Sequence, residues 1–508
     1  MLSAPDYVAL QARLRPNHLA ARNLATGETW SYAAFDRAIG RFHAALVFCG
    51  VGAGDRVTVL AKNRAELIML HLACARLGAI YVPLNWRLAA TEIDALIADA
   101  APTLMISDPD FNANAMTLAA LTDLAAATAP ITSALADPDR PSLLLYTSGT
   151  SGKPKGVLLS ERNLEAQGRH FALLGQVIAQ SVILCDAPMF HTIGLVANIR
   201  PALMQGGSLL ISDGFAPART LARLADPALG VTHYFCVPQM AAMLRADPSF
   251  DPTKLLGLTA IFSGGAPHAA AAIAAWLHDG IPIADGFGMS ETGTISCMPL
   301  DPTAIAARLG AVGAIPPSIR IRIIDDQGND QPASMIGEIL IQGDHVAQAY
   351  WRGPDDAPES ITRDGWLHTG DLGRIDPDGF LWLVDRKKDM IISGGENIYP
   401  AEIENALAAY PGLADSAVIG VPDQQWGEVG HLFLVPTAET PCQTDAVLAY
   451  LTQHLARYKI PKHVTILDQL PRNNAGKLLK AALRQRLDDD SATDRTPFSA
   501  RNSARDPA

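Results

Sequence analysis

Cysteine is scarce in this chain, and its spacing argues against a disulfide framework. Six cysteines occur among 508 residues, far apart in the sequence and mostly in apolar surroundings. No two of them have the Cys-x-x-Cys spacing of zinc and redox sites. The pattern favours free, buried thiols in a reducing compartment. The six are Cys49, Cys74, Cys185, Cys236, Cys297 and Cys442.

Long apolar runs are also absent. The most apolar stretch, residues 67–84, contains His71 and Arg76 and is broken at Gly78. It is short for a membrane span and predicts a buried helix that leads into a strand. Residues 1–20 contain no apolar segment of the kind that a secretory signal carries. We therefore expect a soluble, cytoplasmic protein with no integral membrane segment.

Positive charge is in deficit. The 40 Lys and Arg residues face 52 Asp and Glu residues, which gives a formal net charge of -12. A general nucleic-acid binder usually presents a basic face, so we expect no nucleic-acid partner. Local lysines can still hold a polyanionic small molecule. With 49% hydrophobic residues over this length, the chain can build two or more cores.

Short apolar segments alternate with alanine-rich helical segments through the first part of the chain. This alternation is typical of parallel α/β sheets. From Ser318 the pattern changes to strictly alternating strands separated by turns, which predicts an antiparallel, β-rich subdomain. The expected strands are residues 56–61, 79–84, 232–238 and 259–265, and the expected helices lie near residues 64–77, 90–99 and 268–279.

The charged run at residues 385–390 marks a second change of pattern. An α+β pattern of about 100 residues follows it, which is enough for a small domain. We expect an N-terminal domain over residues 1–387, a C-terminal domain over residues 388–488 and a disordered polar tail over residues 489–508. No internal repeat is visible.

The stretch YTSGTSGKPKGV, residues 146–157, follows the apolar strand segment SLLLY. Its glycines allow close backbone approach to a ligand, successive N–H groups in such a loop form an anion-binding concavity, and lysines add positive charge. The spacing is not that of the Walker phosphate loop. A flexible surface loop is the alternative, but the preceding strand and the lysines favour phosphate binding. The residues concerned are Thr147, Ser148, Gly149, Thr150, Ser151, Gly152, Lys153 and Lys155.

A second stretch places a carboxylate, that of Glu291, shortly after a predicted strand. The stretch GFGMSETG, residues 286–293, comes after IPIAD and places Ser290, Glu291 and Thr292 at a strand end, where α/β sheets hold ligands. A carboxylate beside a phosphate loop would repel the phosphates unless a cation lay between them. Glu291 is therefore interpreted as a Mg²⁺ ligand. A solvent-exposed glutamate on a turn is the weaker alternative.

Three further stretches carry weaker signals. Asp371 lies in a glycine-flanked turn, where an aspartate is commonly structural, although acidic residues also accept hydrogen bonds from ribose hydroxyls. Gly394 and Gly395 make a sharp turn before a helix that has proline in its first turn. Lys477 lies in a polar, glycine-containing loop, and an isolated lysine of this kind is usually only solvated.

Taken in order, these five stretches resemble those of the adenylate-forming superfamily, which includes acyl-CoA synthetases, aryl-CoA ligases, luciferases and the adenylation domains of peptide synthetases. The resemblance runs from about residue 10 to residue 487. Its best local match is to stand-alone fatty-acyl, 4-coumarate/feruloyl and chlorobenzoate CoA ligases. It implies an α/β fold with a large N-terminal domain of parallel sheets, a β-rich subdomain and a small mobile α+β C-terminal domain.

The resemblance implies a reaction in two steps, with ATP and Mg²⁺ used in the first and coenzyme A in the second. A carboxylate attacks the α-phosphate of ATP, which gives acyl-AMP and pyrophosphate, and a thiol then displaces AMP. Lys477 would act in the first step, and the small domain would swing about Lys388 to bring up the glycine turn for the second. Trp426, and Tyr458 with Lys459, would contact coenzyme A, and packing within the small domain explains them about as well.

The resemblance implies which residues would contact each part of ATP. The phosphates would contact Thr147, Ser148, Gly149, Thr150, Ser151, Gly152, Lys155 and Ser290. Adenine would lie against Gly264, Gly265 and Phe287, the ribose would bind Asp371 and Arg386, and Mg²⁺ would bind Glu291. Gly394 and Gly395 would border the tunnel for the thiol.

The same resemblance makes His191 a gate between the acid pocket and the thiol tunnel, although an isolated histidine among apolar residues is usually a core residue. Gly286 stands where malonate-activating relatives carry an arginine, and a second buried carboxylate would need such a partner. Dicarboxylates are therefore disfavoured, and Gly286 is expected to leave room for a ring or an acyl chain. Amino acids would need a pocket aspartate, and none is apparent. The expected pocket residues are His191, Asn198, Phe235, Val237, Ser263, Gly286, Met289 and Ile295.

The main expectation is a ligase that joins an apolar carboxylate, aromatic or fatty, to coenzyme A. A stand-alone adenylating enzyme that loads a carrier protein is the second hypothesis, and a catalytically silent nucleotide-binding regulator is the third. A luciferase is disfavoured because the chain lacks the terminal Ser-Lys-Leu address. The small-molecule acid is the expected partner, and pairing of two copies in a homodimer is left open.

Overall fold

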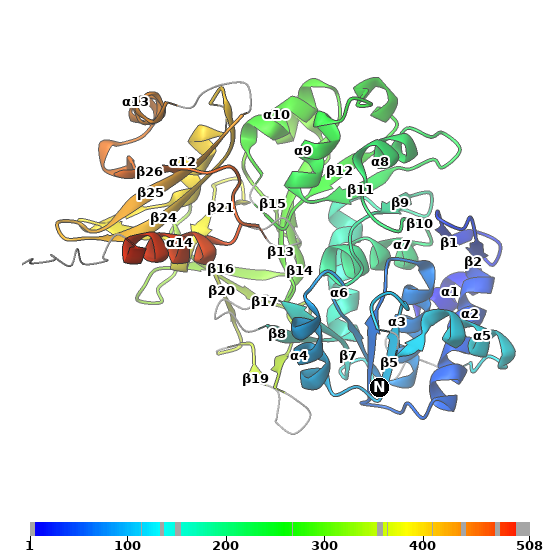
Figure 1. Cartoon of the computed structure of the whole chain (residues 1–508). Coiled ribbons are helices and arrows are strands. Elements are labelled where there is room, and N and C mark those ends of the chain that lie inside the picture. Colours follow the sequence, from blue (N-terminus) through cyan, green and yellow to red (C-terminus); the bar gives the residue numbers. More distant parts are fainter. Residues whose placement is uncertain are drawn as a thin grey trace, which may run out of the picture. The chain divides into compact units, whose positions relative to one another are not determined.

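The computed structural model describes residues 6–112, 114–132, 137–147, 154–266, 268–352, 359–362, 364–408, 410–437, 443–472 and 478–493. The chain divides into two compact units, residues 1–383 and 384–508, and each is described by itself (Figure 1). Within the described ranges, no helix combines the length and the hydropathy that a membrane crossing requires.

The larger sheet of the first unit has thirteen strands among the described residues. The strands of its centre pair in parallel, and from the pair β13–β14 onward the pairing is antiparallel. The predicted change to antiparallel pairing is thus confirmed, but it comes earlier than Ser318. In spatial order the strands are β16 (Arg320–Ile324), β17 (Gly337–Gln342), β20 (Leu367–Ile375), β21 (Phe380–Arg386), β15 (Gly313–Ala314), β14 (Gly293–Cys297), β13 (Ile283–Met289), β12 (Ala260–Ser263), β11 (His233–Cys236), β9 (Val182–Cys185), β10 (Ser208–Ile211), β1 (Leu19–Asn23) and β2 (Thr29–Ser31).

The second sheet of this unit has eight strands in the described part of the chain. Five of them pair in parallel, and β7, β8, β18 and β19 add an antiparallel edge. The predicted strands at residues 56–61 and 79–84 are confirmed as β3 and β4. In spatial order the strands are β19 (Glu359–Ser360), β18 (Ala349–Trp351), β8 (Lys155–Ser160), β7 (Pro141–Thr147), β4 (Ile80–Pro83), β3 (Arg56–Leu60), β5 (Leu104–Ser107) and β6 (Met116–Thr117).

Helices bury both faces of this second sheet because its strands are apolar on both sides. In β7, Leu143 and Leu145 join the main core, while Leu144 joins a separate cluster beneath α4. The helices of the unit are α1 (Tyr7–Leu14), α2 (Tyr32–Phe48), α3 (Ala65–Leu77), α4 (Ala90–Ala100), α5 (Leu118–Ala127), α6 (Glu161–Leu174), the π-helix η1 (Ile193–Ala197), α7 (Ile199–Gln205), α8 (Pro217–Leu224), α9 (Pro238–Ala246), η2 (Pro252–Leu255), α10 (Ala270–His278) and α11 (Pro302–Ala306).

In the part of the second unit that the structure describes, five strands form one sheet with helices on both faces. Val418 and Leu432 point to the face that α12 and α13 cover, while Ile419 and Phe433 point to the face that α14 covers. This alternation is the period of two that strands impose on their side chains. The elements are η3 (Lys387–Asp389), β22 (Ile391–Ser393), β23 (Glu396–Ile398), α12 (Pro400–Leu407), β24 (Leu413–Asp423), β25 (Gly427–Pro436), α13 (Thr444–His454), η4 (Arg457–Lys459), β26 (His463–Ile466) and α14 (Lys480–Thr493).

A buried ion pair lies at the start of α6, directly after β8 of the second sheet. Glu161, the first residue of α6, accepts hydrogen bonds from both terminal nitrogens of Arg200, at 2.7 and 2.9 Å, and one from Ser142 at 2.6 Å. The Arg200 charge outweighs burial and lowers the pKa of Glu161 to about 2. Such a pair costs desolvation, and the added hydrogen bonds make it tolerable in a core.

Two buried histidines lie close together beside α6. The rings of His170 and His345 meet edge to face, with centroids 4.9 Å apart, and His345 has no exposed surface. Burial lowers the pKa of His170 to about 4 and that of His345 to about 3. Both imidazoles are therefore neutral in the folded protein above about pH 5.

Acid should destabilise the first unit through these two histidines. Their folded pKa values lie below the unfolded value of about 6.5, so the stabilisation is complete above that pH and is lost as the pH falls toward 4. Each should cost about 2 kcal/mol of unfolding free energy at pH 5. Denaturant titrations between pH 7.5 and 4.5 should show a shallower decline for His170→Gln/His345→Gln than for the wild type. The exposed His454→Gln is the control, and equal pH slopes for the wild type and the double variant would contradict this account.

Candidate active site

The candidate phosphate loop joins two antiparallel strands of the second sheet. β7 ends at Thr147, β8 begins at Lys155, and the two residues are register partners. The hydroxyl of Thr147 donates a 3.3 Å hydrogen bond to the carbonyl of Lys155. The predicted phosphate residues Ser148, Gly149, Thr150, Ser151 and Gly152 lie outside the described residues. The strand predicted before the loop is confirmed, and the described ends of the loop lie side by side.

Tyr350 connects this hairpin to Glu291. The Nζ atom of Lys155 lies 4.9 Å from the centroid of the Tyr350 ring, and the Tyr350 hydroxyl donates a 3.0 Å hydrogen bond to Oε1 of Glu291. Tyr350 reaches this place because β18 pairs with β8, with Tyr350 opposite Val157. Two predicted site residues are thus brought together through a third that sequence reasoning missed.

Glu291 lies in the tight turn between β13 and β14. A Cβ atom on Gly288 would stand only 2.4 Å from the carbonyl oxygen of Gly293, so these strands meet closely only because residue 288 is glycine. The backbone carbonyl of Glu291 accepts a 2.7 Å hydrogen bond from the amide of Ala347. Turn and carboxylate are therefore fixed from both strands and from the segment that leads into β18.

The chemistry of this site fits Mg²⁺. A magnesium ion takes oxygen ligands and is usually held in enzymes by one or two carboxylates together with phosphates of the substrate. Glu291 is partly exposed, and with the described residues its Oε2 atom makes no hydrogen bond or ion pair. Lys155 brings positive charge to the same place, which suits a triphosphate. Glu291 and Ser290 therefore stay candidates for the metal and the phosphates.

The candidate adenine surface lies at the carboxyl ends of β12 and β13. Ser263 and Asp285 are register partners there, and Gly264 passes so close to β13 that a Cβ atom on it would lie 3.0 Å from the carbonyl of Gly286. Phe287 follows on β13 and is buried. The predicted residue Gly264 therefore follows β12 directly, and Phe287 lies on the adjacent strand β13.

Asp285 was missed by sequence reasoning. Its side chain is almost fully buried, and its Oδ1 atom has no hydrogen-bond partner in the described part of the chain. Burial raises the pKa of Asp285 well above its ordinary value. An acidic residue at the end of the apolar segment IPIAD was the available signal.

The two candidate ribose residues lie in different units. Asp371 is buried on β20, where its amide donates a 3.0 Å hydrogen bond to the hydroxyl of Thr369. In the order of strands, β21, β15 and β14 lie between β20 and β13. Arg386 is the last residue of β21, and its amide donates a 2.7 Å hydrogen bond to Oδ1 of Asp385.

His191 stands just before the π-helix η1. A π-turn is rare and is often found at functional sites. The carbonyl of His191 accepts a 2.9 Å hydrogen bond from Leu195, and its ring meets Phe190 edge to face. Burial lowers the pKa of His191 to about 4, and the positive charge of Arg87 adds to this. The imidazole is therefore neutral at pH 7 and can both accept and donate a hydrogen bond.

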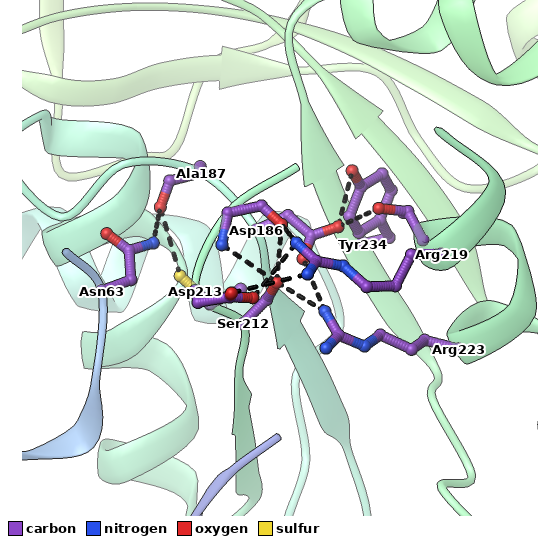
Figure 2. Close-up of polar contacts among 11 residues, drawn as sticks. Asn63, Asp186, Ala187, Ser212, Asp213, Arg219, Arg223 and Tyr234 are labelled. Carbon is purple, nitrogen blue, oxygen red and sulfur yellow. Dashed lines mark hydrogen bonds and ion pairs between the residues drawn. The ribbon is translucent and has the colours of Figure 1, made fainter. Parts of the chain in front are cut away.

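A polar network fixes the end of the strand that leads to His191 (Figure 2). Asp186, directly after β9, accepts a hydrogen bond of 2.5 Å from Thr220 and one of 3.5 Å from Tyr234, and Arg223 lies 3.7 Å away. Figure 2 shows Ser212, Asp213, Arg219 and Arg223 around this carboxylate. Burial raises the pKa of Asp186. The network holds β9, β10 and β11 together at their carboxyl ends.

Asn63 holds the next part of the same segment. Its Nδ2 donates a 2.8 Å hydrogen bond to the carbonyl of Ala187, and its Oδ1 accepts one of 2.9 Å from the amide of Met189. Asn63 is buried in the turn after β3, so it ties the second sheet to the strand end of the first (Figure 2). The segment before His191 is therefore held at the backbone on both sides of Pro188.

Several candidate acid-pocket residues converge near η1. A Cβ atom on Gly265 would lie 3.4 Å from Ile193 and 3.8 Å from Val237. Asn198 is buried, donates a 2.9 Å hydrogen bond from Nδ2 to the carbonyl of Ile193, and keeps Oδ1 without a partner among the described residues. Phe235 is buried on β11 and stacks on Phe171, with ring centroids 5.3 Å apart.

The remaining pocket candidates lie on the β13–β14 hairpin. Ile295 is fully buried and Met289 partly so. The prediction that Gly286 leaves room for a ring or an acyl chain is wrong on the side where a side chain would stand. A Cβ atom on Gly286 would lie 2.8 Å from the carbonyl of Ser296. The backbone of β14 occupies that side of the residue. Glycine at 286 therefore allows the strands to approach, and it does not open a space for a ring or an acyl chain on that side.

In the second unit, the glycine turn packs on a tryptophan. Gly394 and Gly395 both have positive φ angles, +59° and +88°, which glycine adopts without strain. A Cβ atom on Gly394 would stand 2.7 Å from the Trp426 ring, and the amide of Gly394 donates a 2.8 Å hydrogen bond to the carbonyl of Trp426. The Nζ atom of Lys462 lies over this half-exposed ring, at 4.8 Å from its centroid.

Tyr458 and Lys459 lie on η4, whose residues contact β23 of the same unit. Tyr458 is exposed, while Lys459 forms a 2.7 Å ion pair with Glu402. Lys388 lies on η3 between β21 and β22. The predicted catalytic residue Lys477 lies outside the described residues, between the bridge partners Arg472 and Leu478.

Comparison with protein families covers both units. Residues 8–351 match the family of AMP-binding enzymes, and residues 402–477 match the C-terminal domain of AMP-binding enzymes.

Known relatives match the chain over almost its whole length. The chain is 36% identical to a feruloyl-CoA synthase from Amycolatopsis, covering 94% of this chain and 97% of the relative. It is 35% identical to an indoleacetate–CoA ligase from Aromatoleum aromaticum, again over 94% and 97% of the two chains. The o-succinylbenzoate CoA synthetase of Bacillus subtilis, solved with ATP and a magnesium ion, matches with a TM-score of 0.84, 31% identity and 95% and 100% coverage.

Proposed function

The chain belongs to the family of AMP-binding enzymes and is an AMP-forming carboxylate–CoA ligase, and from this premise we propose that its acid is apolar, either aryl or fatty. The choice of acid rests on the apolar character of the candidate pocket residues Phe235, Val237, Met289 and Ile295. The nucleotide site is supported by Lys155 and Glu291, whose side chains contact the same tyrosine beside the phosphate hairpin. Positive charge and a metal-binding carboxylate side by side suit a magnesium triphosphate.

In the first step a carboxylate oxygen attacks the α-phosphate of ATP, acyl-AMP forms and pyrophosphate leaves. Thr147 and Lys155, with Ser148, Gly149, Thr150, Ser151 and Gly152, would hold the phosphates, and Lys477 would neutralise charge at the α-phosphate. Glu291 would hold Mg²⁺, which supplies charge neutralisation between the phosphates when bound. Gly264, Gly265 and Phe287 would flank adenine, and Asp371 and Arg386 would accept the ribose.

In the second step the thiol of coenzyme A attacks the acyl carbon and AMP leaves. Gly394 and Gly395 would line the path of the thiol, and Trp426 and Tyr458 would contact coenzyme A. Lys388 would be the hinge between domains placed at residues 1–387 and 388–488. His191, neutral at pH 7, would separate the acid pocket from the thiol path. We place the protein in the cytoplasm because the five described cysteines are free thiols, and a homodimer stays a prediction.

The pocket proposal rests on polarity. The candidate lining residues Phe235, Val237, Met289 and Ile295 are apolar, and no described carboxylate or arginine is among the eight candidates. A second carboxylate on the substrate would lack a partner and would cost several kcal/mol. An apolar acid therefore fits better than a dicarboxylate, and this holds even though Gly286 does not itself open a space.

AMP release should identify the acid. With ATP, Mg²⁺ and coenzyme A, we expect turnover with cinnamates, benzoates or fatty acids, and a kcat/KM for malonate at least about 100-fold lower. The panel should contain short, medium and long fatty acids, benzoates, cinnamates and malonate, with AMP measured by chromatography. Malonate as the best acid would overturn the pocket proposal. Pyrophosphate exchange without turnover of coenzyme A would favour loading of a carrier protein instead.

Two variants should separate the half-reactions. Lys477→Ala should lower acyl-AMP formation by about 100-fold or more, because it removes charge stabilisation at the α-phosphate, yet should still convert synthetic acyl-AMP and coenzyme A. Gly394→Val should keep acyl-AMP formation and lose the transfer to coenzyme A, because its side chain would collide with the Trp426 ring. Single-turnover assays of each half-reaction measure both. The exposed Lys254→Ala is the control, and equal loss of both half-reactions in Lys477→Ala would contradict the assignment.

A further inference from the structure

Tyr350 contacts both charged groups of the candidate triphosphate site. Its ring lies under Lys155, at 4.9 Å from Nζ, and its hydroxyl donates a 3.0 Å hydrogen bond to Oε1 of Glu291. It is partly buried and packs against the main core. The question is whether this contact sets the geometry of the carboxylate or only fills space.

The backbone around Tyr350 is held from two directions. On one side, β18 pairs with β8, so that Tyr350 stands opposite Val157 and Trp351 opposite Gly156. On the other, Nδ2 of Asn163 donates hydrogen bonds of 2.8 and 2.9 Å to the carbonyls of Asp344 and Val346. Asn163 is in the first turn of α6, directly after β8. The hydroxyl of Tyr350 is therefore presented by a rigid support.

The backbone of Glu291 is tied to the same support. The amide of Ala347 donates a 2.7 Å hydrogen bond to the carbonyl of Glu291, three residues before Tyr350. Carboxylate and backbone of Glu291 are thus both fixed by the segment from Ala347 to Tyr350. This is the arrangement expected of a partner that orients a metal ligand, because such a ligand is fixed by hydrogen bonds from outside the coordination sphere.

We propose that Tyr350 is a positioning residue, which orients the Glu291 carboxylate toward Mg²⁺ and keeps Lys155 apart from that carboxylate for the phosphates. The proposal rests on the proposed function, since it assumes a magnesium triphosphate at this site. The hydroxyl engages Oε1 and leaves Oε2 for the ion. The ring offers Lys155 an electrostatic contact that does not consume the carboxylate.

Charge makes this separation necessary. Lys155 and Glu291 carry opposite charges and, if they met directly, would satisfy each other before a ligand arrived. Within the described ranges neither residue forms an ion pair. A tyrosine between them provides one hydrogen bond and one ring face, so each charge keeps part of its capacity for the ligand. A phenylalanine at this position would keep the ring face under Lys155 and lose the hydrogen bond to Glu291, so the two contacts can be tested separately.

Metal affinity in the nucleotide complex tests the proposal without turnover. Mn²⁺ binding is measured by electron paramagnetic resonance in the presence of saturating α,β-methylene ATP, whose α–β bridge cannot be cleaved to release pyrophosphate. Tyr350→Phe should weaken Mn²⁺ binding by about tenfold, because it removes the hydrogen bond that orients Glu291. Its affinity for the analogue in EDTA and its thermal midpoint should stay at the wild-type values. Tyr350→Leu should in addition lower the affinity for the analogue by about threefold, because Lys155 loses its contact with the aromatic ring.

Tyr7→Phe is the matched control. Tyr7 donates a 2.9 Å hydrogen bond to Oε1 of Glu165, so the same kind of hydrogen bond is removed without touching Glu291 or the phosphate hairpin. It should leave Mn²⁺ affinity unchanged. Unchanged Mn²⁺ affinity in Tyr350→Phe would overturn the positioning role, as would an equal loss in both variants. If the wild-type protein failed to bind the analogue at all, the proposed function itself would fail, which is a distinct result.

Discussion

The pairing of β18 with β8 is the interaction on which the candidate site depends. It brings Tyr350 beside the first residues after the phosphate loop, although the two segments are far apart in the sequence. The same short strand follows the residues that hold the Glu291 backbone. One ladder of backbone hydrogen bonds therefore aligns the loop lysine, the candidate metal ligand and the residue between them. Lys155 and Glu291 belong to separate sheets, and Tyr350 contacts both of them.

Close approach of backbones at glycine supports this alignment. Gly288 lets β13 and β14 make the turn that carries Glu291, and Gly394 lets a turn of the second unit lie on Trp426. In both places a Cβ atom would collide with a neighbouring strand or ring. In each unit the close packing of the backbone therefore requires glycine at this position, independently of any contact with a ligand. The overall negative charge of the chain is no obstacle, since lysine is concentrated where phosphate is expected.

Much of the fold could be predicted from the sequence. The strands at β3, β4, β11 and β12 and the helices α3 and α4 follow the expected positions to within a few residues, because apolar periodicity reflects burial directly. The start of antiparallel pairing was placed too late. The stretch GFGMSETG was predicted to follow a strand that ends at Asp285, yet most of it forms the paired strands β13 and β14. Glycine weakens the strand signal without preventing the strand.

The site could be predicted only where a residue type implies its chemistry. Lysines in a glycine-rich loop and a carboxylate at a strand end carry such a signal, so Lys155 and Glu291 were found. Tyr350 carries none, because its role arises from the pairing of two distant strands and from a hydroxyl that the sequence AYW does not mark. Asp285 differs in kind. Its carboxyl group was visible in the sequence, but its burial and raised pKa depend on tertiary packing.

The measurement that tests the central claim most directly is the fate of a carboxylate oxygen. The acid that gives the fastest AMP release is labelled with ¹⁸O in its carboxylate and turned over with ATP, Mg²⁺ and coenzyme A, and the nucleotide product is analysed by mass spectrometry. Attack on the α-phosphate predicts AMP that carries one ¹⁸O atom. Unlabelled AMP, or ADP as the product, would contradict an acyl-adenylate and with it the account of this site.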